Sequence, residues 1–215
     1  MIVAVKQTFD PRSGAFRVQE RDASQSSALR EFLKREGGFF LELGTGKGMF
    51  FDALCGTYPD RNCIGIERRW KRCRGVEKRT GSSGRVNALI IQGRIEVVIR
   101  ELLPANNFER IFMNFPDPWP KRRMKKHRTL NPDTASDIVR ILEPGGTFLM
   151  ATDCEDYCTA AWNLFNDRED CGLLPQPAVH SLFSDIGLEH SCYASRTLRE
   201  NRSIYMMGVD KTIAS

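Results

Sequence analysis

An acidic side chain stands between prolines in the stretch NFPDPWPKRRMKKHR, residues 114–128. Asp117 lies between Pro116 and Pro118, so the backbone that presents its carboxylate has little freedom. Six of the eight positions from 121 to 128 are Lys or Arg. A carboxylate accepts hydrogen bonds, whereas a run of cations suits a polyanion. The stretch therefore indicates a site for a ligand that offers hydrogen-bond donors and carries negative charge nearby.

A second stretch, LELGTGKG, has glycines at positions 44, 46 and 48 directly after a short apolar run. Glycines at a strand-to-helix turn let the backbone approach a ligand, and the helix N-terminus offers N–H groups to it. Lys47 is followed by Gly rather than by Ser or Thr, which excludes a P-loop for ATP. Met49 stands where a dinucleotide fingerprint needs its third Gly, which disfavours NAD.

Two acidic residues complete this glycine pattern. Glu42 precedes the glycines, and Glu67 ends the next predicted strand, 23 residues after Gly44. An acid at that place accepts hydrogen bonds from a ribose diol. The arrangement resembles the S-adenosylmethionine site of class I methyltransferases, which implies that Glu42 faces the cationic methionine end of the cofactor. The alternative for Glu67 is a surface acid paired with Arg68 or Arg69.

The elements that must position these residues alternate along the chain. Short apolar runs predict strands over 39–43, 62–67, 88–91, 110–115 and 147–152, and helical spacing predicts helices near 29–33, through 54, and over 68–79, 95–103, 133–142 and 155–165. The segment 80–84 is predicted as a loop, 143–146 as a turn and 173–177 as a connector. The stretches 189–196 and 203–210 are predicted as strands that pair as an antiparallel edge. This alternation predicts an α/β fold with a parallel, doubly wound sheet.

Length and composition indicate one domain over 1–215, with an N-terminal extension and leading helix over 1–37 and a catalytic core over 38–215. No apolar run is long enough to span a membrane, and the start lacks an export signal, so we expect a cytoplasmic protein without a membrane partner. The seven cysteines include no CxxC pair and no His partners, so we expect thiols rather than a metal site or disulfides.

The segments 68–74 and 121–128 carry eleven of the 32 basic residues. They suggest a polyanionic partner, although a solvated helix face explains the first segment equally well.

Four blocks in order resemble the bacterial tRNA (guanine-N7-)-methyltransferase family. They are FPDPWPK (115–121), EPGG (143–146), ATDCEDY (151–157) and SRTLRE (195–200). The resemblance runs from about residue 39 to residue 157. It implies a seven-stranded Rossmann-like sheet with an antiparallel edge strand, S-adenosyl-L-methionine as cofactor, and methyl transfer to N7 of a guanine in the variable loop of tRNA. The alternatives are a methyltransferase of the same fold that acts on another RNA or a small molecule, and a non-catalytic RNA-binding relative.

The resemblance also implies roles for individual residues. Guanine N7 carries a lone pair and needs no base, so Asp117 is expected to align the purine through N1–H and the exocyclic amine and to favour the charge that develops on it. The expected cofactor-binding residues are Glu42, Gly44, Gly46, Gly48, Glu67, Arg94 and Asp117. The expected substrate-binding residues are Lys121, Asp153, Thr197 and Glu200. The RNA backbone is expected to contact Arg122, Arg123, Lys125, Lys126 and Arg128.

Each substrate-binding position has a plainer alternative. Lys121 suits ordinary surface charge, Thr197 and Glu200 an ordinary strand-edge pair, and Asp153 a helix N-cap that is compatible with substrate binding. Arg94 departs from the family, which has an Asp there that reaches the adenine amine. Since Arg accepts no hydrogen bond, either Glu96 or a backbone carbonyl must substitute, or cofactor affinity falls. The pattern does not distinguish a monomer from a homodimer.

Overall fold

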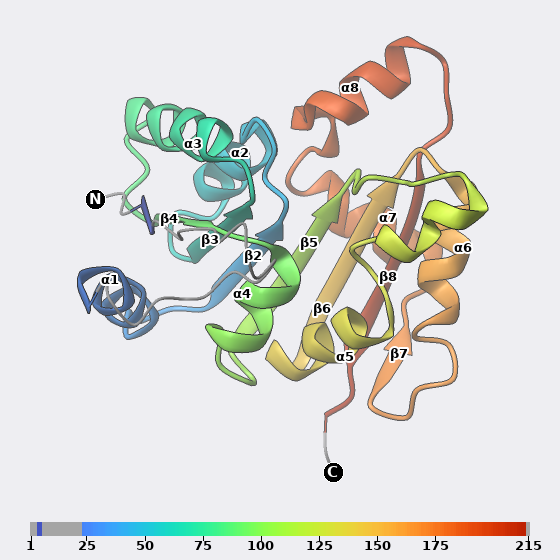
Figure 1. Cartoon of the computed structure of the whole chain (residues 1–215), viewed down its shortest axis with the longest axis horizontal. Helices are drawn as coiled ribbons and strands as arrows, with labels where there is room; N and C mark the ends of the chain where they lie inside the picture. The colour runs from blue at the N-terminus through green and yellow to red at the C-terminus, as the bar shows by residue number, and fades with distance from the viewer. Residues whose placement is uncertain (1–3, 6–22, 214–215) are drawn as a thin grey trace.

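The structure is a computed structural model that describes residues 4–5 and 23–213. Its centre is one sheet in the order β1-β4-β3-β2-β5-β6-β8-β7 (Figure 1). The strands are β1 (Ala4–Val5), β2 (Phe39–Leu43), β3 (Asn62–Glu67), β4 (Ala88–Gln92), β5 (Phe108–Asn114), β6 (Leu142–Thr152), β7 (Cys171–Leu173) and β8 (Tyr205–Lys211). All pairs from β1 to β6 are parallel, whereas β8 runs antiparallel to both β6 and β7. The predicted doubly wound, mostly parallel sheet of seven strands is confirmed, and β1 adds two residues at one edge.

Helices cover both faces of this sheet. They are α1 (Ala23–Leu33), α2 (Met49–Thr57), α3 (Trp70–Ser82), α4 (Ile95–Glu101), α5 (Pro132–Ile141), α6 (Glu155–Asn163), α7 (Gln176–Ser184) and α8 (Cys192–Arg199), with 3-10 turns η1 (Arg122–His127) and η2 (Leu188–His190). One apolar cluster joins the sheet to α1, α4, α5 and α6, and a second joins it to α2, α3 and α7. Every residue of β2 and β3 is buried, which is why these strands read as continuous apolar runs.

Three predictions about local structure were wrong. The stretch 189–196 is not a strand but lies in η2 and α8, and the partner of β8 is β7 instead. The connector 173–177 runs into α7, because a proline in the first turn of a helix needs no N–H there. The loop expected over 80–84 begins later, because Thr80 is buried and Ser83 N–H still donates to the Arg79 carbonyl (3.0 Å), so α3 continues to Ser82. The predicted turn 143–146 lies within the irregular start of β6.

The carboxyl ends of β2, β3, β4 and β5 lie at one edge of the sheet, because these strands are parallel neighbours. Ligands of open α/β sheets bind at that edge, where the strand order reverses. Here the order reverses at β2, between β3 and β5. Among the described residues, no helix combines the length and apolar character that crossing a bilayer requires.

Candidate active site

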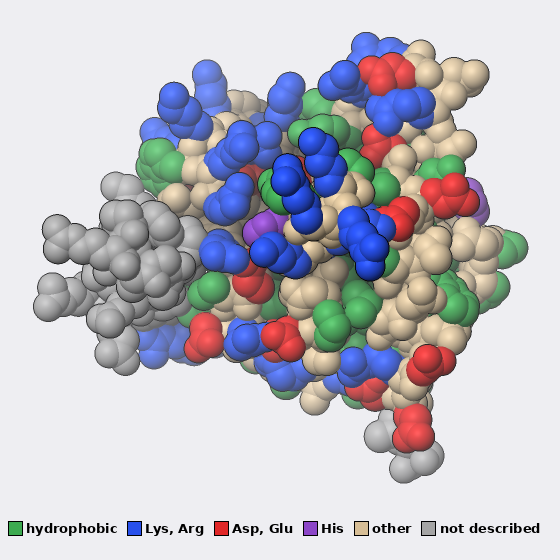
Figure 2. All heavy atoms as spheres, turned by 45° about the vertical axis from the view of Figure 1, so that its right-hand side comes forward, with side chains coloured by type: hydrophobic (Ala, Val, Ile, Leu, Met, Phe, Trp, Pro, Cys, Tyr) green, Lys and Arg blue, Asp and Glu red, His purple; other side chains and the backbone are tan. Residues whose placement is uncertain are grey.

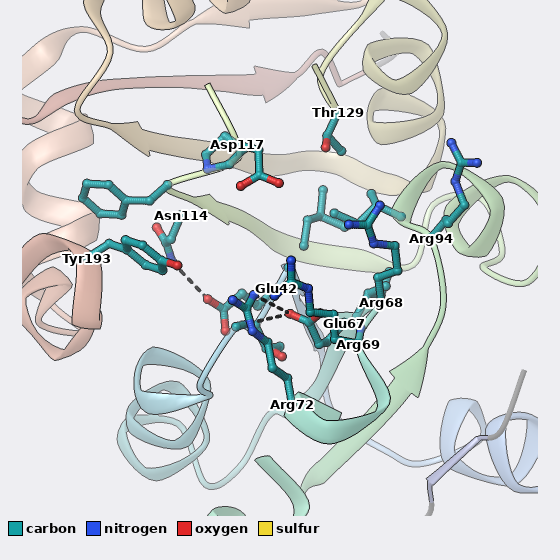
Figure 3. Close-up of a pocket in the computed structure, with 18 of the residues that line it drawn as sticks. Glu42, Glu67, Arg68, Arg69, Arg72, Arg94, Asn114, Asp117, Thr129 and Tyr193 are labelled. Carbon is teal, nitrogen blue, oxygen red and sulfur yellow. Dashed lines mark hydrogen bonds and ion pairs between the residues drawn. The ribbon is translucent and has the colours of Figure 1, made fainter. Parts of the chain in front are cut away.

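A cavity of about 390 Å³ opens at this edge of the sheet (Figure 3). Its walls come from the turns that follow β2, β3, β4 and β5, and from the segment that joins η2 to α8. The turn after β2 carries the glycines, and the turn after β5 carries Asp117. The fold thus brings the glycine turn and the Asp117 loop, which are about 70 residues apart in the chain, to one cavity.

The glycines in the turn after β2 all have positive φ angles, and all three line the cavity. A Cβ on Gly48 would lie 2.7 Å from Val76 Cγ2, so this glycine lets α2 approach α3. A Cβ on Gly46 would come no closer than 4.0 Å to another atom, the Gly44 carbonyl oxygen. The open space at Gly46 is therefore room for a ligand rather than for packing.

Glu42 lies at the floor of the cavity with 2% of its surface exposed. Asn114, the last residue of β5, donates a hydrogen bond from Nδ2 to Glu42 Oε1 (3.3 Å). Burial raises the pKa of Glu42 to about 8, against the lowering effect of this hydrogen bond. Glu42 Oε2 and Asn114 Oδ1 are buried without a hydrogen-bond partner in the described part of the chain. Two buried acceptors without a donor indicate that a cationic or donor-rich ligand group belongs here.

Glu67, at the end of β3, is buried and accepts two backbone hydrogen bonds. Gly46 N–H donates to Oε2 (3.1 Å) and Arg69 N–H donates to Oε1 (2.7 Å), while Arg72 Nη1 lies 3.7 Å from Oε2. The alternative of a surface acid is wrong, because only 5% of Glu67 is exposed. A carboxylate oxygen can accept two hydrogen bonds and each Glu67 oxygen accepts one from the backbone, so capacity for a ribose diol remains.

These residues fit S-adenosylmethionine. The cofactor carries an amino group and a sulfonium at its methionine end, which match the unsatisfied acceptors of Glu42 and Asn114. Its ribose diol matches the remaining acceptor capacity of Glu67. Gly46, where a Cβ would meet open space, lies between these two acids in the chain and lines the same cavity.

The loop that carries Asp117 adopts an unusual backbone. Phe115 and Trp119 each precede a proline and have positive φ angles of 49° and 41°. Non-glycine residues rarely adopt this region, and such strain concentrates at functional sites. The loop leaves the Asp117 side chain exposed, and Figure 3 shows its carboxylate directed into the cavity, across from Glu42 and Glu67.

Arg128, the last residue of the basic run 121–128, supports the loop that carries Asp117. Arg128 is 6% exposed, lies with its guanidinium carbon 4.4 Å from the ring centroid of Tyr157, and donates from Nη2 to Asp156 (2.5 Å). Its Nε donates to the Pro118 carbonyl oxygen (2.9 Å), next to Asp117. Arg128 also lines the cavity, so its contact with an RNA backbone stays a prediction, while in this structure its guanidinium is buried against the protein's own groups.

The rest of the basic run is accessible. Arg122, Arg123 and Lys126 are exposed, and Lys126 lines the cavity. Lys125 forms an ion pair with Asp156 (2.6 Å). Figure 2 shows Lys and Arg side chains gathered across the upper left and centre of this face. Across the cavity, the start of α3 adds further cationic lining residues, namely Arg68, Arg69 and Arg72.

The expected substrate-binding residues fall into two groups. Asp153 and Glu200 both form ion pairs with Arg202, and the Thr197 carbonyl accepts a hydrogen bond from Arg202 N–H (3.0 Å). These residues gather around Arg202 outside the cavity lining, whereas Lys121 is exposed at the start of η1.

Two plainer alternatives for these positions are wrong. Thr197 lies in α8 and Glu200 caps its end, so they are not a strand-edge pair. The N-cap of α6 is Cys154 rather than Asp153, and Thr152 Oγ1 accepts the hydrogen bond from Cys154 N–H (3.2 Å).

Arg94 is the N-cap residue of α4 and forms an ion pair with Glu96. Both residues line the cavity, and Figure 3 shows the Arg94 guanidinium directed away from Glu42 and Glu67. Glu96 therefore lies close enough to the cavity to be the acceptor that Arg94 cannot be.

Asn114 and Tyr193 are among the lining residues that were not predicted from the sequence. Asn114 stands directly before the Asp117 motif, and its place as the last residue of a strand at the ligand edge was a usable signal. Tyr193 was hidden by the wrong prediction of a strand over 189–196.

The fold is that of the Rossmann-like methyltransferases, and the site fits their cofactor. A 30S ribosomal methyltransferase from an uncultured bacterium superimposes with a TM-score of 0.58 at 18% identity, covering 87% of this chain and 94% of that structure. The model of a family described as "Putative methyltransferase" matches residues 36–203, and the chain belongs to that family. Family and fold together imply S-adenosylmethionine as the methyl donor.

Curated relatives carry a more particular name. A tRNA (guanine-N(7)-)-methyltransferase of Chlamydia abortus is 34% identical over 146 residues, which cover 68% of this chain and 63% of that protein. One of the same name from Hydrogenovibrio crunogenus is 37% identical over 124 residues, which cover 57% of this chain and 51% of that protein. The chain thus spans about half to two thirds of the length of these two relatives. The resemblance stated from the sequence motifs is confirmed at the level of the family.

Proposed function

We propose that this protein transfers the methyl group of S-adenosylmethionine to N7 of a guanine in the variable loop of tRNA. One observation carries the proposal: the strained loop after β5 directs the exposed Asp117 carboxylate into the cavity that Glu42 and Glu67 line. An aligning group for a base thereby faces the groups that suit the cofactor. The names of the curated relatives support this substrate and this position of methylation.

The proposed reaction requires the protein mainly to align guanine N7 with the methyl group of the cofactor. Bound S-adenosylmethionine supplies an electrophilic methyl group on a sulfonium. Glu42 and Asn114 hold its amino acid end, and Glu67 holds its ribose. Asp117 accepts hydrogen bonds from the Watson–Crick edge of the guanine, which points N7 on the opposite side of the base toward the methyl group. No proton leaves N7, and the positive charge that develops on the purine is favoured by the nearby carboxylate.

The charge around the cavity suits a folded RNA. Arg122, Arg123 and Lys126 on one side, and the start of α3 on the other, offer cations to phosphates that accompany the base. In this proposal Lys121, Asp153 and Glu200 contact the nucleotide or its neighbours, while the buried Thr197 holds the end of α8 beside them through the hydrogen bond that its carbonyl accepts from Arg202 N–H. Residues 38–215 form the catalytic core, and the protein works in the cytoplasm, where tRNA is modified.

The test is incubation of the purified protein with labelled S-adenosylmethionine and unmodified tRNA transcripts, followed by mass analysis of the nucleosides. We expect 7-methylguanosine with the unmutated protein and a loss of about a hundredfold or more with Asp117→Ala. Methylation of another RNA or a small molecule without 7-methylguanosine in tRNA would refute the proposed substrate. Salt-sensitive tRNA binding without cofactor binding would instead identify a non-catalytic RNA-binding protein.

A further inference from the structure

An aromatic side chain from α8 stands at the mouth of the cavity. Tyr193 lines the cavity, yet 47% of its surface is exposed. Its ring is stacked on Phe115, with ring centroids 6.1 Å apart and an interplanar angle of 21°. Phe115 also lines the cavity and lies two residues before Asp117. Figure 3 shows the Tyr193 ring beside Asn114, with Asp117 above them. Phe115 thus supports one side of the Tyr193 ring, while a large part of that ring remains accessible.

The end of α8 that carries Tyr193 is anchored to the core. Ala194 is fully buried in the apolar cluster that includes Phe112, and Cys192 Sγ lies 2.9 Å from Met49 Sδ at the start of α2. Toward the other end of the helix, the side chain of Leu198 is 57% exposed. In Figure 1, α8 projects beyond the ends of β5 and β6. An exposed aromatic ring held on an anchored helix end is preorganised for contact with a ligand.

A flat purine needs two kinds of contact to be fixed. Asp117 offers hydrogen bonds to the edge of the base, but an edge contact leaves the base free to tilt. Aromatic side chains stack on unpaired bases with little dependence on sequence. The face of an aromatic ring also attracts cations, and methyl transfer moves the positive charge from the sulfonium sulfur to the purine as the S–CH₃ bond breaks and the N7–CH₃ bond forms. A ring beside Asp117 therefore supplies the missing contact and favours the product-like charge.

We propose that Tyr193, supported by Phe115, is the stacking surface for the guanine that is methylated. The inference rests on the proposed function and extends it, because it assigns a substrate-binding role to α8. The proposed stacking uses the ring of Tyr193 and not its hydroxyl, so phenylalanine at this position is expected to serve equally well. Leu198 offers a matched control, since it is an exposed apolar residue on the same helix, five positions away and on a different side.

The experiment compares Tyr193→Ala, Tyr193→Phe and Leu198→Ala in methylation of an unmodified tRNA transcript. We expect the KM for tRNA to rise about tenfold or more in Tyr193→Ala, and to stay near the unmutated value in the other two variants. The affinity for S-adenosylmethionine, measured by calorimetry, is expected to stay unchanged in all three, which reports intact folding of the cofactor site. An unchanged KM in Tyr193→Ala would overturn the inference and leave the proposed function standing.

A second measurement separates the inference from the proposed function. With S-adenosylhomocysteine bound, the unmutated protein is expected to bind 7-methylguanosine monophosphate more tightly than guanosine monophosphate, and this preference is expected to be smaller in Tyr193→Ala, where only the Asp117 carboxylate still favours the charged base. If no transcript is methylated by the unmutated protein, the proposed function fails, and the nucleotide comparison still decides the role of the ring. Equal preference in the unmutated protein and in Tyr193→Ala would contradict the stacking role.

Discussion

Asn114 donates a hydrogen bond to Glu42 across 3.3 Å, and each side chain keeps one buried oxygen that has no donor among the described residues. The pair joins the ends of β2 and β5, the two strands that carry the glycine turn and the Asp117 loop. A carboxyl group held in this way prefers to stay protonated until a cation arrives. The affinity of the site for its cofactor is therefore linked to pH.

The first prediction concerns this linkage. Burial raises the pKa of Glu42 to about 8, so the carboxyl is mostly neutral at pH 7 in the cofactor-free protein. A cationic ligand favours the ionised form, so we expect S-adenosylmethionine to bind more tightly as pH rises from 6 to 8, with release of up to about one proton. Calorimetry in buffers of different ionisation enthalpy measures that release. Glu42→Gln is expected to abolish it and to weaken binding about tenfold or more, whereas Glu101→Gln, on the exposed end of α4, should change neither.

The Glu42 carboxyl also affects the free energy of unfolding of the cofactor-free protein. This free energy is expected to fall as pH rises, whereas the cofactor affinity is expected to rise. Because the folded-state pKa of Glu42 lies above the unfolded value of 4.5, the folded protein binds the extra proton between pH 4.5 and 8. Stability must then fall as pH rises through this window. We expect Glu42→Gln to be more stable than the unmutated protein at pH 8.5, by on the order of 1–3 kcal/mol in denaturant unfolding. Equal or lower stability of the variant at that pH would contradict the burial of an uncompensated carboxyl.

The third prediction separates two arginines of the basic run. Arg128 holds the Pro118 carbonyl and is buried, whereas Arg122 is exposed. We expect Arg128→Met to lower the free energy of unfolding by about 1–3 kcal/mol and to reduce kcat, because the loop with Asp117 loses its support. Arg122→Met, the matched control, should leave both quantities unchanged and raise only the KM for tRNA. Identical behaviour of the two variants would refute a supporting role for Arg128.

Salt dependence tests the accessible cations as an RNA surface. Each phosphate contact that is lost reduces the slope of log affinity against log salt by roughly 0.7–0.9. We expect the triple variant of Arg122, Arg123 and Lys126 to Gln to bind tRNA more weakly at low salt, with a slope reduced by about two to three such contacts. Filter binding across a range of potassium chloride concentrations measures this. A slope equal to that of the unmutated protein would remove these residues from the interface.

Structural features that depend on neighbouring residues could be predicted from the sequence, whereas features that depend on residues distant in the chain could not. The bounds of β2 and β3 were predicted to the residue, because both strands are buried on both faces and end at glycines or charges. The acids Glu42 and Glu67 followed from those strand ends. The burial of Arg128 could not be predicted, because its partners Asp156 and Tyr157 lie 28 and 29 residues further along the chain.

The last third of the chain was less predictable for a physical reason. The helix α8 has only eight residues and buries few of them, Ala194 and Thr197 among them, so its pattern is too short to distinguish a helix from a strand. Its placement depends on contacts with α2 through Cys192 and Met49, which are distant in sequence. Tyr193 reaches the cavity because of such tertiary contacts, among them the burial of Ala194 in the apolar cluster that includes Phe112.

The most direct test of the central claim replaces guanine by 7-deazaguanine throughout a tRNA transcript. This change keeps the Watson–Crick edge that Asp117 is proposed to hold and removes only the nitrogen that is proposed to accept the methyl group. With labelled S-adenosylmethionine, we predict methylation of the ordinary transcript and none of the 7-deazaguanine transcript, while the second competes with the first for binding. Methyl transfer to the 7-deazaguanine transcript would show that another atom is the acceptor and would contradict the proposed reaction.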